Sequence, residues 1–142
     1  MTSSESEEYL QGLGKRVQAL ARQLDALLMD EGCNSYVKTI YIGYDIGGEM
    51  VAALYGHADH VEVALALPES EEHHLLVDAT HLTWRTMPVA AIVRTSADAK
   101  DVASLIRLAC ERVRAGAHDV HRDNEFFVRA KRGRRQAAEP PR

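Results

Sequence analysis

Residues 36–67, YVKTIYIGYDIGGEMVAALYGHADHVEVALAL, hold three runs of apolar, β-branched and aromatic residues separated by turn-forming residues. The runs Tyr36–Tyr44, Met50–Tyr55 and His60–Leu67 have the length and composition of β-strands. The glycine pair at 47–48 lies between the first two runs and favours a tight turn, because glycine adopts positive φ angles without steric cost. The segment therefore predicts three antiparallel strands joined by short turns.

The segment before these strands has the periodicity of an amphipathic helix. Ser4 and Glu7 have the spacing of a capping box, and apolar residues then recur at steps of three and four. Gly12 and Gly14 weaken the first turns, so we expect the helix over residues 15–31. The stripe predicts packing onto the domain's own sheet or a homodimer formed through this first helix. It consists of Leu10, Leu13, Val17, Leu20, Leu24 and Leu27.

After the three strands, a polar loop leads to one more strand and a second helix. Met87–Arg94 has strand composition, and Pro88 lies near its start, where a missing amide is tolerated. We expect Ser96 to cap a helix over residues 96–115 and Gly116 to end it. The buried face of this helix is expected to hold Val102, Leu105, Ile106, Ala109 and Val113.

The order of elements is therefore helix, antiparallel meander of four to five strands, helix. Neither helix connects two parallel strands, as a doubly wound sheet requires, so the fold class is α+β and not α/β. We expect the N-terminal and the C-terminal helix to cover one face of the sheet. No repeat or linker divides the chain, which predicts a single domain over residues 1–128 and a basic, disordered tail over residues 129–142.

The composition is that of a globular protein. Hydrophobic residues make up 46% of the 142 residues and charged residues 27%, which excludes an intrinsically disordered chain. No apolar run approaches the roughly 20 residues that span a bilayer, and the N-terminus MTSSESEEYL is unlike a secretory signal. Cys33 and Cys110 lack CxxC spacing, so we expect two buried, reduced thiols. These features predict a cytoplasmic protein without membrane association.

The chain resembles a family of bacterial domains of unknown function. The similarity lies in YVKTIYIGYD, MVAALYG, HVEVALALP, the pair Trp84-Arg85 and VRTSADAKDVASLIRLACERV, and it covers residues 10–116. Members of this family are sometimes labelled predicted transport proteins and are sometimes joined to nuclease-associated modules. The resemblance implies the fold, but no catalytic residue is carried over from it. The histidine-rich centre and residues 117–142 depart from the family's pattern.

The sequence contains no known catalytic or nucleotide-binding motif. It has no GxSxG elbow, no P-loop and no GxGxxG. We therefore expect a small binding or protein-interaction module without catalytic activity of its own. Such a module needs no cofactor and binds an unknown protein or small molecule. The alternative class is a metal-dependent enzyme that uses histidine and carboxylate groups.

Seven histidines supply the imidazole groups on which that alternative depends. His57 and His60 flank a predicted turn, and His73 and His74 lie in the acidic loop that follows the third strand. Imidazole and carboxylate groups suit zinc and similar ions. On a continuous strand His57 and His60 would point to opposite faces, so only the turn could bring them to one ion. We expect structural or surface histidines, with a metal site at these four residues as the alternative.

The lone tryptophan, Trp84, lies beside Arg85. Aromatic rings with polar tips suit contacts with ligands or partners, so these two residues and four tyrosines form a candidate binding surface. In the alternative, the rings cap the core of the sheet. If residues 36–44 form one strand, Tyr36 and Tyr44 point to one face of the sheet and Tyr41 points to the other. The four are Tyr36, Tyr41, Tyr44 and Tyr55.

The end of the chain is strongly basic. Residues 129–142 contain six basic residues and one acidic residue, a charge of +5, and the total of -4 leaves -9 for residues 1–128. Such a run can hold phosphate backbones or acidic surfaces through charge alone. Weak, non-specific nucleic-acid binding is therefore an alternative function, although the acidic body opposes it. The basic run consists of Arg129, Lys131, Arg132, Arg134 and Arg135.

Overall fold

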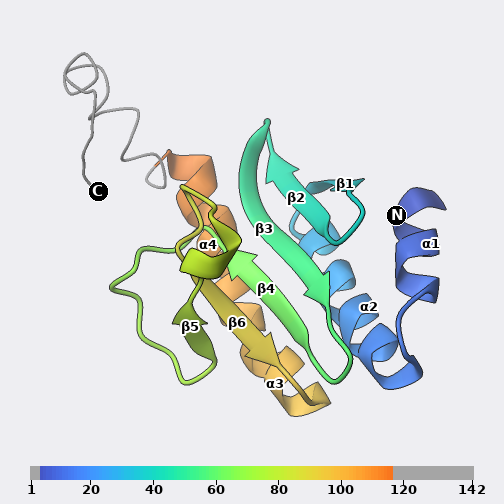
Figure 1. Cartoon of the computed structure of the whole chain (residues 1–142). Helices are drawn as coiled ribbons and strands as arrows, with labels where there is room; N and C mark the ends of the chain where they lie inside the picture. The colour runs from blue at the N-terminus through green and yellow to red at the C-terminus, as the bar shows by residue number, and fades with distance from the viewer. Residues whose placement is uncertain (1–3, 117–142) are drawn as a thin grey trace.

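The structure is a computed structural model that describes residues 4–116. The basic tail and the domain boundary expected at residue 128 lie outside the described residues. None of the helices within residues 4–116 combines the length and the apolar character needed to cross a membrane. The elements follow in the order α1 (Ser4–Gln11), α2 (Lys15–Asp30), β1 (Asn34–Val37), β2 (Ile42–Ile46), β3 (Glu49–Gly56), β4 (Val61–Leu65), β5 (Leu76–Asp78), η1 (Thr80–Leu82), β6 (Val89–Val93), α3 (Ser96–Asp101) and α4 (Ala103–Ala115) (Figure 1).

The strands form one antiparallel sheet of six strands in the order β1-β2-β3-β4-β6-β5. The first four strands form an antiparallel meander, β6 pairs with β4, and β5 lies at the edge beyond β6. The α+β class and the antiparallel sheet are therefore confirmed. The predicted number of four to five strands was too low.

Residues 36–44 form a hairpin and not the single strand that we expected. The amide of Lys38 donates a hydrogen bond of 2.9 Å to the carbonyl of Tyr41, which reverses the chain between β1 and β2. Tyr36 thereby becomes the cross-strand partner of Gly43. The sequence gives no signal for this turn, because residues 38–41 include neither glycine nor proline.

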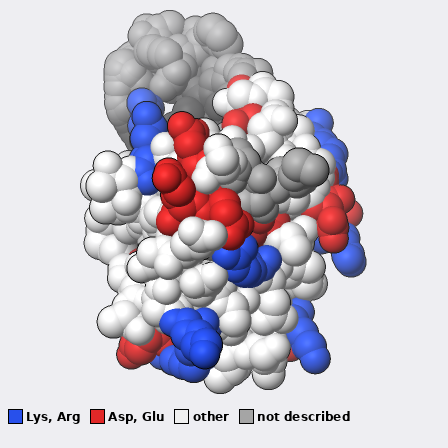
Figure 2. Space-filling model, turned by 90° about the vertical axis from the view of Figure 1, so that its right-hand side faces the viewer, with Lys and Arg blue, Asp and Glu red and all other residues white. Residues whose placement is uncertain are grey.

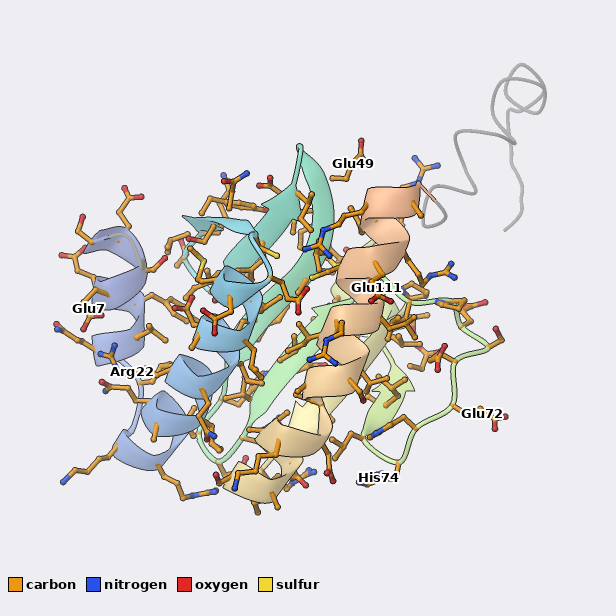
Figure 3. All side chains as sticks on the ribbon, turned by 180° about the vertical axis from the view of Figure 1, so that it is seen from behind. Glu7, Arg22, Glu49, Glu72, His74 and Glu111 are labelled. Atoms are coloured by element: carbon orange, nitrogen blue, oxygen red, sulfur yellow. The ribbon has the colours of Figure 1, made fainter. Side chains whose placement is uncertain are left out.

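Helices α2, α3 and α4 cover one face of the sheet, which Figures 1 and 3 show from opposite sides. A polar pair lies within this apolar layer: the hydroxyl of Tyr44 on β2 donates a hydrogen bond of 2.7 Å to Oδ1 of Asp25 on α2. Both residues are buried. Burial raises the pKa of the Tyr44 phenol, and the Asp25 carboxylate raises it further. The fully buried apolar side chains of the core include Leu24, Leu28, Ile42, Leu54, Leu65 and Ile106.

The N-terminal helix is broken, because Gly12 and Gly14 lie in a turn between α1 and α2. An ion pair joins the two helices: Arg22 donates to both carboxylate oxygens of Glu7, at 2.9 and 2.6 Å (Figure 3). The apolar stripe is buried within the chain itself. It therefore does not supply the free surface on which the homodimer prediction depended. The buried members are Leu10, Val17, Leu20 and Leu24.

The predicted C-terminal helix consists of two helices, α3 and α4, that meet at Val102. Its N-cap is Thr95 and not Ser96. The hydroxyl of Thr95 accepts from the amide of Asp98 at 3.1 Å, and the Asp98 carboxylate accepts from the amide of Thr95 at 3.3 Å. This reciprocal capping box satisfies two amides that the first turn leaves free. Gly116 ends α4 with a positive φ of 75°, as predicted.

The face of the sheet away from the helices carries the loop of residues 79–88, which we call the front loop. The amide of Ala79 donates a hydrogen bond of 2.9 Å to the carbonyl of Pro88, and this bond closes the loop at its base. The loop contains η1, which Figure 1 shows in front of the sheet. Thr83 ends η1 in the left-handed conformation, with φ of 62°. Trp84 follows directly, so the front loop positions it over the sheet.

Candidate binding surface

A row of small residues crosses the middle of the sheet on the face away from the helices. Gly43, Ala53, Ala64 and Ala90 are successive cross-strand partners on β2, β3, β4 and β6. Side chains alternate along a strand, and Tyr44 points to α2, so the row that begins at Gly43 faces the other side. The three alanines are fully buried. Larger side chains therefore lie over this row.

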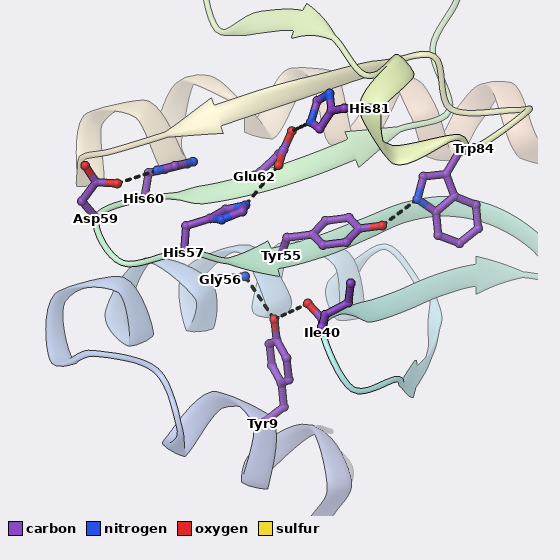
Figure 4. A network of polar contacts seen from close by, with 10 residues as sticks. All are labelled: Tyr9, Ile40, Tyr55, Gly56, His57, Asp59, His60, Glu62, His81 and Trp84. Carbon is purple, nitrogen blue, oxygen red and sulfur yellow. Dashed lines mark hydrogen bonds and ion pairs between the residues drawn. The ribbon is translucent and has the colours of Figure 1, made fainter.

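Four aromatic residues lie together on this face and form what we call the aromatic cluster: Tyr36, Tyr41, Tyr55 and Trp84. The ring of Tyr41 is central, with its centroid 5.9 Å from Tyr36, 5.3 Å from Tyr55 and 5.5 Å from Trp84. Its contacts with Tyr36 and Trp84 are edge-on, an arrangement that the ring quadrupoles favour. The indole Nε1 of Trp84 donates a hydrogen bond of 2.8 Å to the hydroxyl of Tyr55 (Figure 4). The hydroxyls of Tyr36 and Tyr41 are 3.2 Å apart.

Gly43 allows the ring of Tyr36 to lie against the sheet. A Cβ atom at residue 43 would lie 2.3 to 2.6 Å from atoms of the Tyr36 ring and its hydroxyl, well inside contact distance. The Tyr36 hydroxyl also donates to Sδ of Met50 at 3.4 Å. Burial and the hydrogen bond with Tyr41 raise the pKa of Tyr36, and burial raises the pKa of Tyr55. Both phenols therefore stay protonated at neutral pH.

The aromatic cluster is partly open to solvent, since Tyr55 is its one buried member. Ile40, in the turn between β1 and β2, is 65% exposed although its side chain is apolar. Lys38, in the same turn, is exposed and holds its Nζ 6.0 Å from the centroid of the Tyr36 ring. Arg85 is exposed beside Trp84. Lys38 therefore borders the rings, and Ile40 and Arg85 are the sequence neighbours of Tyr41 and Trp84.

The structure brings together most of the binding surface that the sequence predicts. The four members of the aromatic cluster come from β1, the β1–β2 turn, β3 and the front loop. Arg85 adjoins them in the front loop. Tyr44 does not belong to this surface, because it is fully buried on the opposite face and bonded to Asp25. It is a core residue.

Tyr9 on α1 anchors the turn that carries Ile40. Its hydroxyl donates a hydrogen bond of 2.8 Å to the carbonyl of Ile40 and accepts one of 3.1 Å from the amide of Gly56 (Figure 4). Burial raises the pKa of this phenol. The contact joins residues 31 positions apart, so no local pattern in the sequence could reveal it.

A buried carboxylate with two histidines adjoins the aromatic cluster; we call His57, Glu62 and His81 the His–Glu–His group. Glu62 is the cross-strand partner of Tyr55. Its Oε1 lies 3.1 Å from Nε2 of His57, and its Oε2 lies 2.6 Å from Nε2 of His81 (Figure 4). Glu62 is 5% exposed, whereas the side chains of His57 and His81 are 43% and 55% exposed. Because an ionised carboxylate only accepts hydrogen bonds, both imidazoles donate through Nε2.

The four histidines that the sequence offered as metal ligands form two stacked pairs. The rings of His57 and His60 are 4.5 Å apart, and those of His73 and His74 are 4.6 Å apart. His74 pairs with Asp101 of α3 at 3.6 Å. Within residues 4–116, no three His, Cys, Asp or Glu side chains are arranged to hold a metal ion. These four histidines contact carboxylates, one another and, through Nδ1 of His73, the amide of Leu75.

The five tail residues offered as a nucleic-acid contact, Arg129, Lys131, Arg132, Arg134 and Arg135, lie outside the described residues. Within residues 4–116, 17 acidic residues outnumber 10 basic ones. Figure 2 shows side chains of both signs interspersed on one side of the molecule. The described domain therefore carries the net negative charge that opposes binding of a polyanion.

Comparisons with protein-family models, with curated proteins and with solved structures found no match to this chain.

Proposed function

We propose that this domain is a protein-interaction module that binds a segment of a partner protein at the aromatic cluster. One observation carries the proposal: four aromatic rings, partly open to solvent, lie together on the sheet face away from α2, α3 and α4. Tyrosine and tryptophan provide large contact areas at a low cost in conformational entropy and are enriched in protein interfaces.

The cluster is held in place before any partner arrives. The front loop is joined to β3 by the hydrogen bond from Trp84 to Tyr55, and the hairpin turn is joined to α1 and β3 through Tyr9. Rigid contact residues lower the entropy that binding would otherwise cost. The arrangement therefore favours a defined interface over a flexible one.

The border of the cluster indicates the chemistry of the partner. Ile40 and the rings of Tyr41 and Trp84 suit an apolar side chain, whereas the exposed Lys38 suits a carboxylate. We infer a partner segment that carries one or two apolar side chains flanked by aspartate or glutamate.

Selection of peptides from a random displayed library tests this proposal with a defined probe. We expect the wild-type chain to enrich peptides that combine an apolar anchor with acidic flanks. Trp84→Ala should weaken their binding about tenfold or more, which is typical of a central aromatic contact. Lys38→Glu changes an exposed residue, so it should weaken binding without affecting folding.

Val77→Ala is the matched control, because Val77 is also an exposed apolar residue but lies on the edge strand β5. It should leave peptide binding unchanged. Failure to enrich any peptide, or equal binding by wild type, Lys38→Glu and Trp84→Ala, would refute the proposed function.

The His–Glu–His group favours a second candidate function, acid–base catalysis. A carboxylate that accepts from one nitrogen of an imidazole fixes its tautomer and orientation and leaves the other nitrogen as a proton acceptor. Glu62 does this for His57 and for His81. Because Glu62 pairs with Tyr55, this group adjoins the same surface on which the proposed partner binds.

Nitrogen-15 NMR of the imidazole rings tests the second candidate. We expect His57 and His81 to carry their protons on Nε2 in the wild type and to become tautomeric mixtures in Glu62→Gln. His74 is the internal control, since its side chain is 67% exposed and makes no contact with Glu62 in the structure. If His57 and His81 are already mixtures in the wild type, Glu62 does not orient them and this candidate fails.

A further inference from the structure

Two cysteines that are 77 residues apart in sequence meet in the core. Sγ of Cys33 lies 3.9 Å from Sγ of Cys110, and both residues are buried. Cys33 lies between α2 and β1, and Cys110 lies in α4. The sequence predicts two buried thiols, but it does not predict that they are neighbours.

Arginine side chains of α4 hold the two cysteine-bearing segments together. Arg114, one turn after Cys110, donates to the carbonyl of Glu31, two residues before Cys33. Nε of Arg107 lies 3.7 Å from Oε2 of the same Glu31. These contacts fix α4 against the turn that carries Cys33, so the two sulfurs are neighbours in the folded state.

The contact between the two sulfurs shifts their pKa values in opposite directions. The hydrogen bond with Cys33 lowers the pKa of Cys110 and the positive charge of Arg114 acts in the same direction, whereas burial and the carboxylates of Glu31 and Glu111 raise it. The hydrogen bond with Cys110 and burial raise the pKa of Cys33. Of the two thiols, Cys110 is therefore the one that ionises more readily and the better nucleophile.

We propose that Cys33 and Cys110 form a redox-active dithiol, which a peroxide such as hydrogen peroxide converts into an intramolecular disulfide. In the first step the Cys110 thiolate attacks one peroxide oxygen, the O–O bond breaks, and the sulfur becomes a sulfenic acid while hydroxide leaves and takes up a proton as water. In the second step the sulfur of Cys33 attacks the sulfenic sulfur, its proton is lost, and a second water leaves. The two thiols lose two electrons, and the peroxide gains them.

Formation of the disulfide requires the two sulfur atoms to move closer together. Sulfurs in a disulfide are about 2 Å apart, so the two Sγ atoms must approach by about 2 Å. The bond would join the turn before β1 to α4 and would enclose the whole sheet in one covalent loop. Because such a cross-link restricts the unfolded chain, the oxidised protein should unfold at a higher temperature than the reduced protein.

The experiment uses the native 142-residue chain. The reduced protein is treated with hydrogen peroxide, remaining thiols are blocked with an alkylating agent, and peptides are analysed by mass spectrometry with and without reductant. We expect a peptide pair linked through Cys33 and Cys110, which reductant separates. Cys33→Ser should instead stop at sulfenic acid or higher oxides on Cys110.

Two results would overturn the proposal. One is a native protein whose thiols stay unoxidised under conditions that oxidise the urea-unfolded chain. The other is oxidation that yields higher oxides or links between two chains without the internal bond. The midpoint of thermal unfolding gives an independent readout on the same wild-type sample: it should rise on oxidation and return with reductant. If the midpoint of thermal unfolding does not rise on oxidation, the disulfide does not fit the native core and the proposal is contradicted.

Discussion

The indole nitrogen of Trp84, in the front loop, donates a hydrogen bond of 2.8 Å to the hydroxyl of Tyr55 on β3. This bond joins a loop to a central strand of the sheet, on the face away from α2, α3 and α4. Tyr55 is in turn the cross-strand partner of Glu62. The aromatic cluster and the His–Glu–His group are therefore parts of one continuous surface.

Tyr55→Phe tests the first of these contacts. The change keeps the ring but removes the acceptor of the Trp84 N–H, and it should lower the free energy of unfolding by about 1 kcal/mol. Because Trp84 is the sole tryptophan, its fluorescence reports directly on the front loop. We expect an altered emission spectrum in the folded variant and faster amide hydrogen exchange in residues 79–88. Unchanged emission and exchange would show that this bond does not hold the loop.

Gly43→Ala should displace the ring of Tyr36, because the added methyl would lie 2.3 to 2.6 Å from it. We expect a loss of stability of about 1 kcal/mol or more, which urea unfolding can measure. In a Tyr36→Ala background the same substitution should be neutral or slightly stabilising, since the obstacle is gone and alanine restricts the unfolded chain. Equal costs in both backgrounds would contradict this packing.

Alkaline pH should destabilise the protein through Tyr44. Folding raises the pKa of this phenol above its ordinary value of about 10. The stability that Tyr44 contributes is therefore fully present below that pH. As the pH rises above about 10, the unfolded chain ionises first and stability falls. Ultraviolet absorbance of tyrosinate and circular dichroism should then change together. Tyr44→Phe should show a shallower loss; an equal slope in both proteins would exclude Tyr44 as the cause.

Thr95→Ala and Ser96→Ala distinguish the observed helix cap from the predicted one. Thr95 caps α3, so its replacement should cost about 1 kcal/mol in the free energy of unfolding. The hydroxyl of Ser96 lies 3.4 Å from Oε1 of Gln23, a long contact at the surface, so its loss should cost less. Chemical denaturation measures both. A larger cost at Ser96 would contradict the assigned cap.

The fold class could be predicted because the spacing of apolar residues and the composition change where helices give way to strands. Apolar steps of three and four mark α2 and α4, and the glycines at 47–48 mark the β2–β3 turn, where both have positive φ. The turn after Val37 escaped prediction because β-branched and aromatic residues continue through it. That one error put Tyr36 on the wrong face: the hairpin turns it onto the side of Gly43, opposite to Tyr44, which lies in the core.

The candidate site could be predicted only in part. Polar-tipped rings indicated Tyr36, Tyr41, Tyr55 and Trp84, and the structure brings these four together. The contact of Glu62 with His81 joins residues 19 positions apart through the path of the front loop, which no sequence pattern specified. Where the bounds of a strand are known, local patterns reveal which face a residue occupies, but not which loop folds over that face.

The most direct test of the central claim, that a partner segment binds at the aromatic cluster, is NMR mapping of the amide signals during titration with a selected acidic and apolar peptide. We predict that the largest shift changes fall in residues 36–43, 53–56 and 79–86, with little change in α2 and α4. Changes centred on the helix-covered face or on the outer edge of β5, with the aromatic cluster unperturbed, would contradict the account.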